Sequence, residues 1–113
     1  MKIPTDGKLL RIFIGEADRA NGKPLYAEIV ALARAHGMAG ATVVKGCMGF
    51  GRNSHMHTAN LLRLSTDLPV IVEIVDSEEK IAAFLPLLDP LVTEGLATLE
   101  KAHVIFYRGG ERS

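Results

Sequence analysis

Two short segments with apolar side chains on both faces constrain the fold of this chain most. Residues 9–14 read Leu-Leu-Arg-Ile-Phe-Ile, and residues 70–75 read Val-Ile-Val-Glu-Ile-Val. Short apolar runs rich in β-branched and aromatic residues are typical of β-strands. A strand with two apolar faces is generally buried on both of them. We therefore expect a sheet that is covered by protein on each side.

The segments between these strands predict the other elements. After a turn at Asn21-Gly22, a one-sided apolar stripe predicts a helix over about residues 24–36, with Pro24 as its first residue. Gly37 then serves as a left-handed cap. Residues 41–44 predict a second strand, and residues 102–107, Ala-His-Val-Ile-Phe-Tyr, predict the last strand.

A second helix is expected after an N-cap at Asp76-Ser77, with an apolar stripe from Ile81 to Leu88. Pro86 lies inside this stripe and predicts a kink or two short helices. Residues 61–64 fit a strand or a helix. The order β-α-β-β-α-β is that of an α+β, ferredoxin-like fold in one domain over residues 1–113, with two helices on one face of a four-stranded antiparallel sheet.

The second face of that sheet predicts a homo-oligomer. Two helices on one face leave the opposite apolar face bare, and such a patch is larger than soluble monomers usually expose. We therefore expect copies of the chain to pack through their sheets. The alternative is that some of these side chains face a long loop.

Composition excludes several classes of protein. Thirteen basic and thirteen acidic residues give zero formal net charge, and the chain has no Trp, two Tyr and four Phe, so a nucleic-acid partner is not expected. Cys47 is the single cysteine, which excludes an internal disulfide. The sequence has neither a signal-peptide core in residues 1–7 nor an apolar run long enough for a membrane helix. We expect a cytoplasmic protein.

Two segments could bind a phosphate or a base. Gly46, Gly49 and Gly51 lie within six residues and could bring backbone N–H groups close to a ligand, although the pattern alone favours a flexible bulged hairpin. The tail from Arg108 to Arg112 has two guanidinium groups, which can bind phosphate oxygens through bidentate hydrogen bonds. Its alternative is a frayed, solvated terminus.

Soft-metal ligands are also clustered in one segment, which comprises Cys47, Met48, His55, Met56 and His57. Such side chains suit copper(I) or zinc, but their spacing matches no closed tetrahedral motif. Packing at the end of a strand is the alternative for Cys47 and Met48. No Ser-His-Asp grouping is readable, and no feature requires an acid–base enzyme.

Several motifs resemble, in order, those of the PII signalling proteins. They are Val44-Lys45-Gly46, Gly49-Phe50-Gly51-Arg52, Leu68-Pro69, Glu73-Ile74-Val75 and Arg108-Gly109-Gly110-Glu111-Arg112. Over about residues 7–108 the chain is more similar to the PII-like family known as domain of unknown function 190. The hallmarks of that family are the segments 10–16, 22–26, 37–43, 49–51, 57–58 and 68–70.

This resemblance implies a homotrimer with an adenine-nucleotide site in each cleft between subunits. By matching position, the base of a mobile T-loop would contact adenine through Lys45, Gly46 and the segment Gly49, Phe50, Gly51 and Arg52. Arg108, with Arg112 nearby, would reach the phosphates from the neighbouring subunit.

The chain departs from the PII pattern in two places. Residues 93–99, which match the PII phosphate loop, contain no lysine, so AMP or ADP is a better candidate ligand than ATP. The segment from Phe50 to Leu68 contains no tyrosine, which excludes the tyrosine modification known in PII proteins.

These observations favour a regulatory protein that binds AMP or ADP and acts on a partner through a mobile loop around residues 52–59. No required cofactor is expected. Members of the resembled family are often associated with fluoride-channel genes, which suggests a transporter or channel partner. One alternative is a CutA-like trimer that binds copper or zinc through Cys47, His55 and His57. Another alternative is a slow nucleotide hydrolase, although an enzyme is not the expectation.

Overall fold

A computed structural model describes residues 5–51, 57–58 and 67–109. Its three long strands are β1 (Thr5–Gly15), β7 (Pro69–Ser77) and β8 (Leu96–Val104). Its helices are α1 (Leu25–Ala35) and α2 (Glu78–Leu88). The short strands are β2 (Arg19–Ala20), β3 (Lys23–Pro24), β4 (Thr42–Lys45), β5 (Met48–Gly49) and β6 (His57–Thr58).

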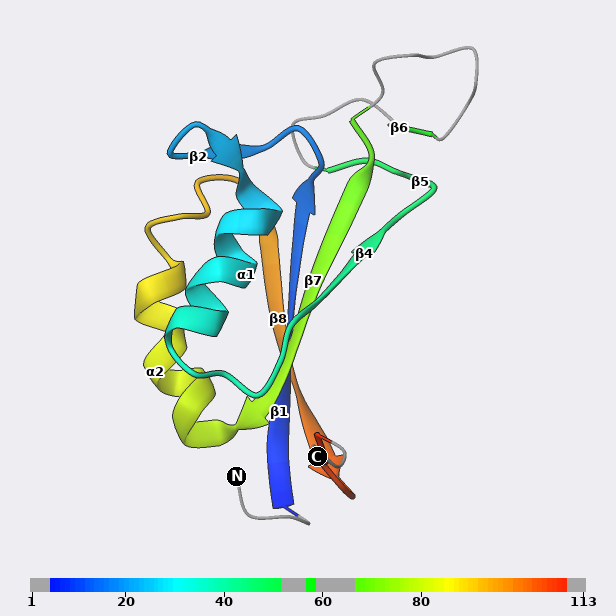
Figure 1. The fold of residues 1–113 in the computed structure, drawn as a ribbon. Helices are drawn as coiled ribbons and strands as arrows, with labels where there is room; N and C mark the ends of the chain where they lie inside the picture. The colour runs from blue at the N-terminus through cyan, green and yellow to red at the C-terminus, as the bar shows by residue number, and fades with distance from the viewer. Residues whose placement is uncertain (1–4, 52–56, 59–66, 110–113) are drawn as a thin grey trace.

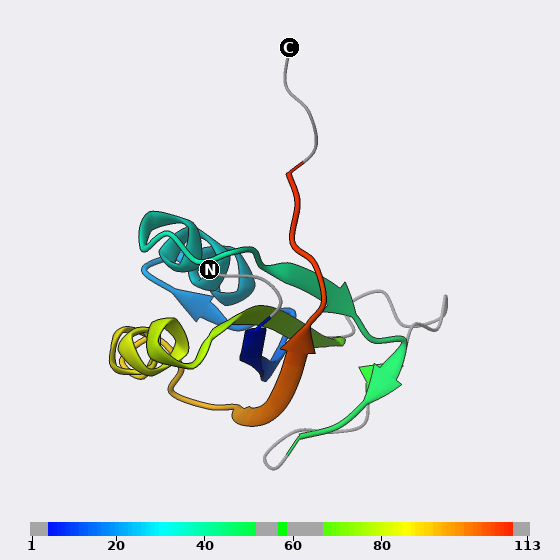
Figure 2. The ribbon, with the colours of Figure 1, turned by 90° about the horizontal axis from the view of Figure 1, so that it is seen from below.

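Four strands form one antiparallel sheet in the order β4-β7-β1-β8 (Figure 1). β1 lies in the middle, where Leu10 pairs with Ile74 of β7 and with Leu99 of β8. Both helices lie on one side of the sheet (Figure 2). The predicted ferredoxin-like α+β fold is therefore confirmed.

The hydrophobic core lies between the helices and the face of the sheet that they cover. Alternate residues of β1 and β7 point into it, as the period of two in a strand requires. The core residues on the strands are Leu10, Ile12, Ile14, Val70, Val72 and Ile74, and those on the helices are Leu25, Ile29, Ala33, Ile81, Phe84 and Leu88.

The intervening residues of the strands form the opposite face, which we call the open face. Its apolar side chains in the two central strands are Leu9, Phe13, Ile71 and Val75. None of them is buried within the single chain, and Val75 is 37% exposed. No helix of the described part of the chain covers this face, as the sequence analysis expected (Figure 2).

Local signals in the sequence place the helix ends within a residue. Asn21 and Gly22 both have positive φ, 55° and 76°, and form the predicted turn between β2 and β3. Gly37, with φ 67°, follows α1. Pro24 occupies the N-cap position instead of the first helical position. The Ser77 side chain accepts a hydrogen bond from the Lys80 amide at 3.3 Å and caps α2 as predicted.

α2 is one helix with Pro86 inside it, so the alternative of two short helices is wrong, and the alternative of a kink stays a prediction. A proline cannot donate to the carbonyl four residues earlier, which here belongs to Ala82. Both residues are exposed, so water can hydrate that carbonyl without breaking the helix. Neither helix of the described residues is long and apolar enough to cross a membrane.

The predicted bounds of the last strand are also wrong. β8 begins at Leu96 and ends at Val104, which pairs with Thr5, so the apolar residues 105–107 lie beyond the sheet. β8 is an edge strand without a buried residue, and its mixed sequence gives no periodic apolar signal. The segment 93–99, matched to the PII phosphate loop, is therefore half strand.

Candidate functional site

The first candidate segment, residues 45–51, starts where β4 ends beside the first residue of β7. The Gly46 amide donates to the Pro69 carbonyl at 2.7 Å, and the Glu16 amide donates to the Leu68 carbonyl at 2.8 Å. These two bonds join the ends of β4 and β1 to the start of β7. Lys45 and Gly46 are thus held at one end of the sheet, where β4 and β1 end and β7 begins.

Close packing against Pro69 explains two of the three glycines. A Cβ atom added at Gly46 would lie 2.8 Å from the Pro69 Cγ atom, and one added at Gly49 would lie 3.1 Å from it. The first distance is shorter than real Cβ contacts, and the second requires the proline ring to shift. The chain therefore needs glycine at Gly46 for its own packing, whether or not a ligand approaches there.

Lys45 is paired with a carboxylate that sequence reasoning did not assign to the site. Its Nζ atom contacts Glu16 Oε2, and this hydrogen bond and charge raise the pKa of Lys45 above its usual value. Glu16 lies in a segment fixed on both sides. Asp18 accepts from the Gly15 amide at 2.9 Å, and Asp67 accepts from the Ala17 amide at 2.6 Å.

The sequence signal that could have placed Glu16 in the site is its position directly after the predicted first strand. The end of an interior strand lies beside the ends of its neighbours, but which neighbours these are depends on the strand order. The order β4-β7-β1 brings Glu16 and Lys45 to one edge of the sheet, on either side of β7.

The remaining residues of this segment are exposed where they are described. Phe50 is 73% exposed, and Cys47 is a free, exposed cysteine. The described residues contain no group of three His, Cys, Asp or Glu side chains that could hold a metal ion. Arg52 and His55 lie outside the described residues, and His57 is described only through the backbone pairing of β6 with β5. The predicted metal site and the predicted mobility of residues 52–58 therefore stay predictions.

The second candidate segment, residues 105–109, extends away from the end of β8; we call it the C-terminal arm (Figure 2). The Arg108 guanidinium carbon lies 4.5 Å from the centre of the Phe106 ring, within the range of a cation–π contact. The Tyr107 hydroxyl donates to the Ala39 carbonyl at 2.6 Å. Arg112 lies outside the described residues.

The two candidate segments lie at opposite ends of the sheet. Lys45 ends β4 and lies near the Gly15 end of β1, whereas the arm follows β8 at the Thr5 end, and β8 runs down to that end near the bottom of Figure 1. Eleven residues of β1 separate these ends by about 33 Å at the usual rise of about 3.3 Å per residue. One chain therefore does not bring Lys45 and Arg108 together.

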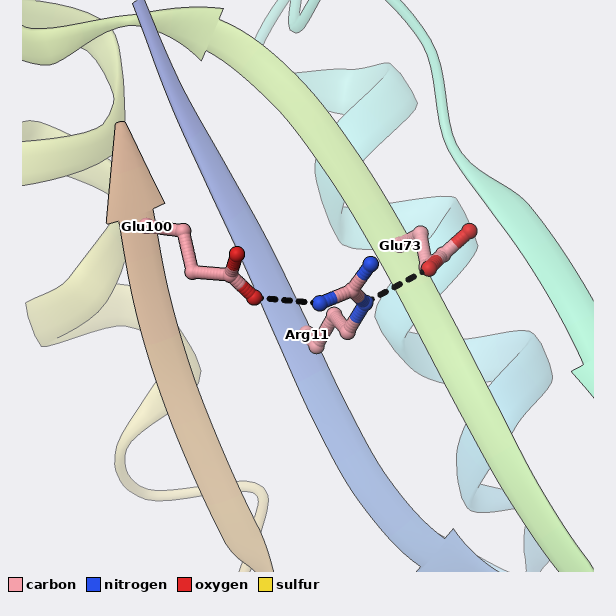
Figure 3. Close-up of polar contacts among 3 residues, drawn as sticks. All are labelled: Arg11, Glu73 and Glu100. Carbon is pink, nitrogen blue, oxygen red and sulfur yellow. Dashed lines mark hydrogen bonds and ion pairs between the residues drawn. The ribbon is translucent and has the colours of Figure 1, made fainter. Parts of the chain in front are cut away.

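Three charged side chains interrupt the apolar open face (Figure 3). Arg11 in β1 donates through Nε to Glu73 Oε2 of β7 at 2.8 Å, and through a terminal nitrogen to Glu100 Oε1 of β8. The hydrogen bond to Glu73 is the largest cause of the raised pKa of Arg11. The one guanidinium pairs with both carboxylates, so this group of three side chains carries one net negative charge on the open face.

Solved structures with this arrangement of elements are PII-like proteins. CPII from Thiomonas intermedia K12, a nitrogen regulatory PII-like protein bound to ADP, AMP and bicarbonate, matches with a TM-score of 0.63 and 19% identity. This match covers 90% of this chain and 91% of CPII. A PII-like protein from Thermus thermophilus matches with a TM-score of 0.63 and 18% identity, over 88% and 90% of the two chains. The fold is therefore PII-like.

Sequence comparison then defines the family. Residues 7–104 match the DUF190 family, described as Uncharacterized ACR. A UPF0166 protein of Aquifex aeolicus (strain VF5) is 41% identical over 99 residues, which cover 88% of this chain and 93% of the relative. A UPF0166 protein of Methanocaldococcus jannaschii is 38% identical over 103 residues, covering 90% and 93%. The chain belongs to the DUF190 (UPF0166) family.

Proposed function

We propose that this protein is a homotrimeric, PII-like regulator that binds AMP or ADP in clefts between copies of the chain. The observation that carries the proposal is the separation of Lys45 and Arg108 at opposite ends of the sheet. Each end offers part of a nucleotide site, and a second copy could place one part beside the other. The binding of ADP and AMP by CPII, which has the same fold, supports this ligand class.

The end at Lys45 suits the uncharged part of a nucleotide. Three carboxylates, those of Glu16, Asp18 and Asp67, lie around this end of the sheet and would repel a phosphate. The exposed ring of Phe50 can stack on a base, since base–aromatic stacking needs only an accessible ring face. We therefore assign adenine to Lys45, Gly46, Gly49, Phe50, Gly51 and Arg52.

The end at Arg108 suits the phosphate. Within the described ranges 5–51 and 67–109, Arg108 has a ring contact but no carboxylate partner. A guanidinium without a paired carboxylate can donate two parallel hydrogen bonds to phosphate oxygens. Arg112 is a second candidate for the same phosphate. The loop between α2 and β8, residues 89–95, has two acids and no lysine, which favours AMP or ADP over ATP.

The open face supplies a surface on which copies can assemble. Burial of its apolar side chains stabilises the assembly by about 25 cal/mol for each Å² removed from water. Arg11 already pairs with Glu73 and Glu100 in the single chain, which lowers the cost of removing these charges from water and leaves one net negative charge in the interface. We propose that trimer formation uses this face.

The regulatory part of the proposal concerns residues 52–59, which lie mostly outside the described residues. Nucleotide binding at their base would bias the segment between two states, and a transporter or channel in contact with the cytoplasm would read the difference. The proposed role is therefore ligand sensing and not catalysis.

Calorimetric titration with AMP, ADP, ATP, Zn²⁺ and Cu⁺ in parallel tests the ligand class. We expect saturable binding of AMP and ADP with one site per chain, together with a trimer in sedimentation equilibrium. Absence of nucleotide binding combined with tight metal binding would replace this function with the CutA-like alternative. A protein that is monomeric at micromolar concentration would contradict a nucleotide site shared between copies of the chain.

A further inference from the structure

The C-terminal arm makes one contact with the rest of its own chain and one contact within itself. The Tyr107 hydroxyl donates a 2.6 Å hydrogen bond to the Ala39 carbonyl, which ties the arm to the connection between α1 and β4. The Phe106 ring packs under the Arg108 guanidinium at 4.5 Å. One contact therefore fixes the backbone of the arm, and the other orients the charged group at its end.

The point to which Tyr107 is attached is itself firmly held. The Ala39 amide donates to Asp76 Oδ2 at 2.8 Å, and the other carboxylate oxygen of Asp76 accepts from the Ser77 amide at 2.7 Å. Asp76 is the buried charged residue of the described chain, only 3% exposed, at the junction of β7 and α2. The residue Ala39 is thus fixed from both sides, through its amide by Asp76 and through its carbonyl by Tyr107.

We infer that Tyr107 is a positioning residue for Arg108, which it holds in the direction needed to meet a phosphate at a neighbouring copy. This inference rests on the proposed function, in which Arg108 binds the phosphate of AMP or ADP. Arg108 directly follows Tyr107, so the hydroxyl contact fixes the backbone one residue before the guanidinium. An arm without this contact samples more directions. The affinity for AMP then falls in proportion to the fraction of chains in which Arg108 points toward the phosphate.

A double-mutant cycle separates positioning from a general structural effect. The variants are Tyr107→Phe, Arg108→Ala and both together, with AMP affinity measured by calorimetry and assembly by sedimentation equilibrium. We expect Tyr107→Phe to weaken AMP binding about two- to fivefold, the range for a half-exposed neutral hydrogen bond. In the Arg108→Ala background the same change should have no further effect. Ile105→Ala, at a 72% exposed arm position without either contact, should bind AMP like the parent.

Backbone NMR order parameters without nucleotide give a second readout. The order parameters of residues 105–108 should be lower in Tyr107→Phe than in the parent, whereas those of β1 and β7 should be unchanged. Equal order parameters in the arm, unchanged AMP affinity, or an equal loss of affinity with and without Arg108 would each overturn the positioning role. A parent protein that binds no nucleotide would instead refute the proposed function, and this inference with it.

Discussion

Glu16 and Lys45 form an ion pair across the first residues of β7. Glu16 follows β1, Lys45 is the last residue of β4, and β7 lies between these two strands in the sheet. Hydrogen bonds from the Gly15 and Ala17 amides hold the backbone on both sides of Glu16, whereas the Lys45 side chain is more than half exposed. A ligand at this edge therefore meets a lysine whose charge is already compensated. Because the proposed site places adenine here, Glu16 competes with the ring nitrogens of adenine for the Lys45 ammonium.

Replacing Glu16 by Gln should strengthen AMP binding. Glutamine keeps the size and one hydrogen-bond acceptor but removes the negative charge that competes for Lys45. We expect AMP affinity to rise about fivefold at low salt, with the gain shrinking as salt screens exposed charges. Calorimetry at two ionic strengths measures this. Weaker binding in Glu16→Gln would mean that Glu16 contacts the ligand or must hold Lys45 in place.

The same pair predicts a pH window for its contribution to stability. The pKa of Lys45 is raised in the folded chain, so the pair stabilises the fold fully below the ordinary lysine value of 10.5 and loses this contribution as pH rises through the higher folded value. The difference in thermal midpoint between the parent and Glu16→Gln should be constant from about pH 6 to pH 9 and should shrink above the ordinary lysine value. A difference that disappears near neutral pH would contradict this assignment.

A methyl group at Gly46 should destabilise the fold. The added Cβ would lie 2.8 Å from the Pro69 ring, and relieving such a contact typically costs about 1–3 kcal/mol. Urea unfolding of Gly46→Ala measures the cost. Gly40→Ala is the matched control, because a Cβ there meets nothing within 4 Å.

Removing the proline ring tests the stated cause. In the Pro69→Ala background the nearest atom to the new Cβ is gone, so Gly46→Ala should cost much less there than in the parent. Equal costs in both backgrounds would show that the glycine is required for another reason.

The sequence predicts the elements of this fold wherever local signals are strong. The apolar runs that form β1 and β7, the turn at Asn21-Gly22 and the Ser77 cap depend on neighbouring residues, and all are confirmed. The sequence alone places β8 too late because an edge strand buries little and need not alternate. The alternative of two helices separated at Pro86 is wrong because water can hydrate the exposed Ala82 carbonyl, which has lost its donor.

The candidate site is less predictable because its contacts depend on strand order. Glu16 and Lys45 are far apart in sequence, and only the pairing of β7 with both β1 and β4 brings them to one edge. The glycine pattern suggests ligand contacts, but the packing of these glycines depends on where Pro69 lies across the sheet. Arg11 likewise needs both neighbouring strands before its two carboxylate partners can be identified.

A negative charge on the open face should prevent assembly. In Val75→Glu, a side chain at a 37% exposed position stays partly hydrated in the monomer but would lose water, unpaired, in the trimer. We expect sedimentation equilibrium to show a trimer for the parent and monomers for this variant at micromolar concentration. Leu87→Glu, at a 40% exposed position on α2, should remain trimeric. If both variants assemble alike, copies do not pack through the open face.

Removing the Arg108 side chain beyond Cβ should weaken nucleotide binding without affecting assembly. Charge-assisted hydrogen bonds to phosphate contribute about 1.5–3 kcal/mol, so Arg108→Ala should bind AMP and ADP about 10- to 150-fold more weakly. The trimer should persist, because Arg108 lies beyond β8 and forms no ion pair within residues 5–51 and 67–109.

The control for this change is Arg34→Ala, which removes an exposed arginine from the last turn of α1, in the helix layer. Its loss lowers the net charge equally, so any general electrostatic attraction for nucleotide falls by the same amount in both variants. Only Arg108→Ala should lose the direct contact and show the large change. The parent should also bind AMP and ADP at least as tightly as ATP, since residues 89–95 offer no lysine for a third phosphate. Normal AMP affinity in Arg108→Ala, or a strong preference for ATP, would exclude the arm from the phosphate site and leave only the edge at Lys45 as a candidate.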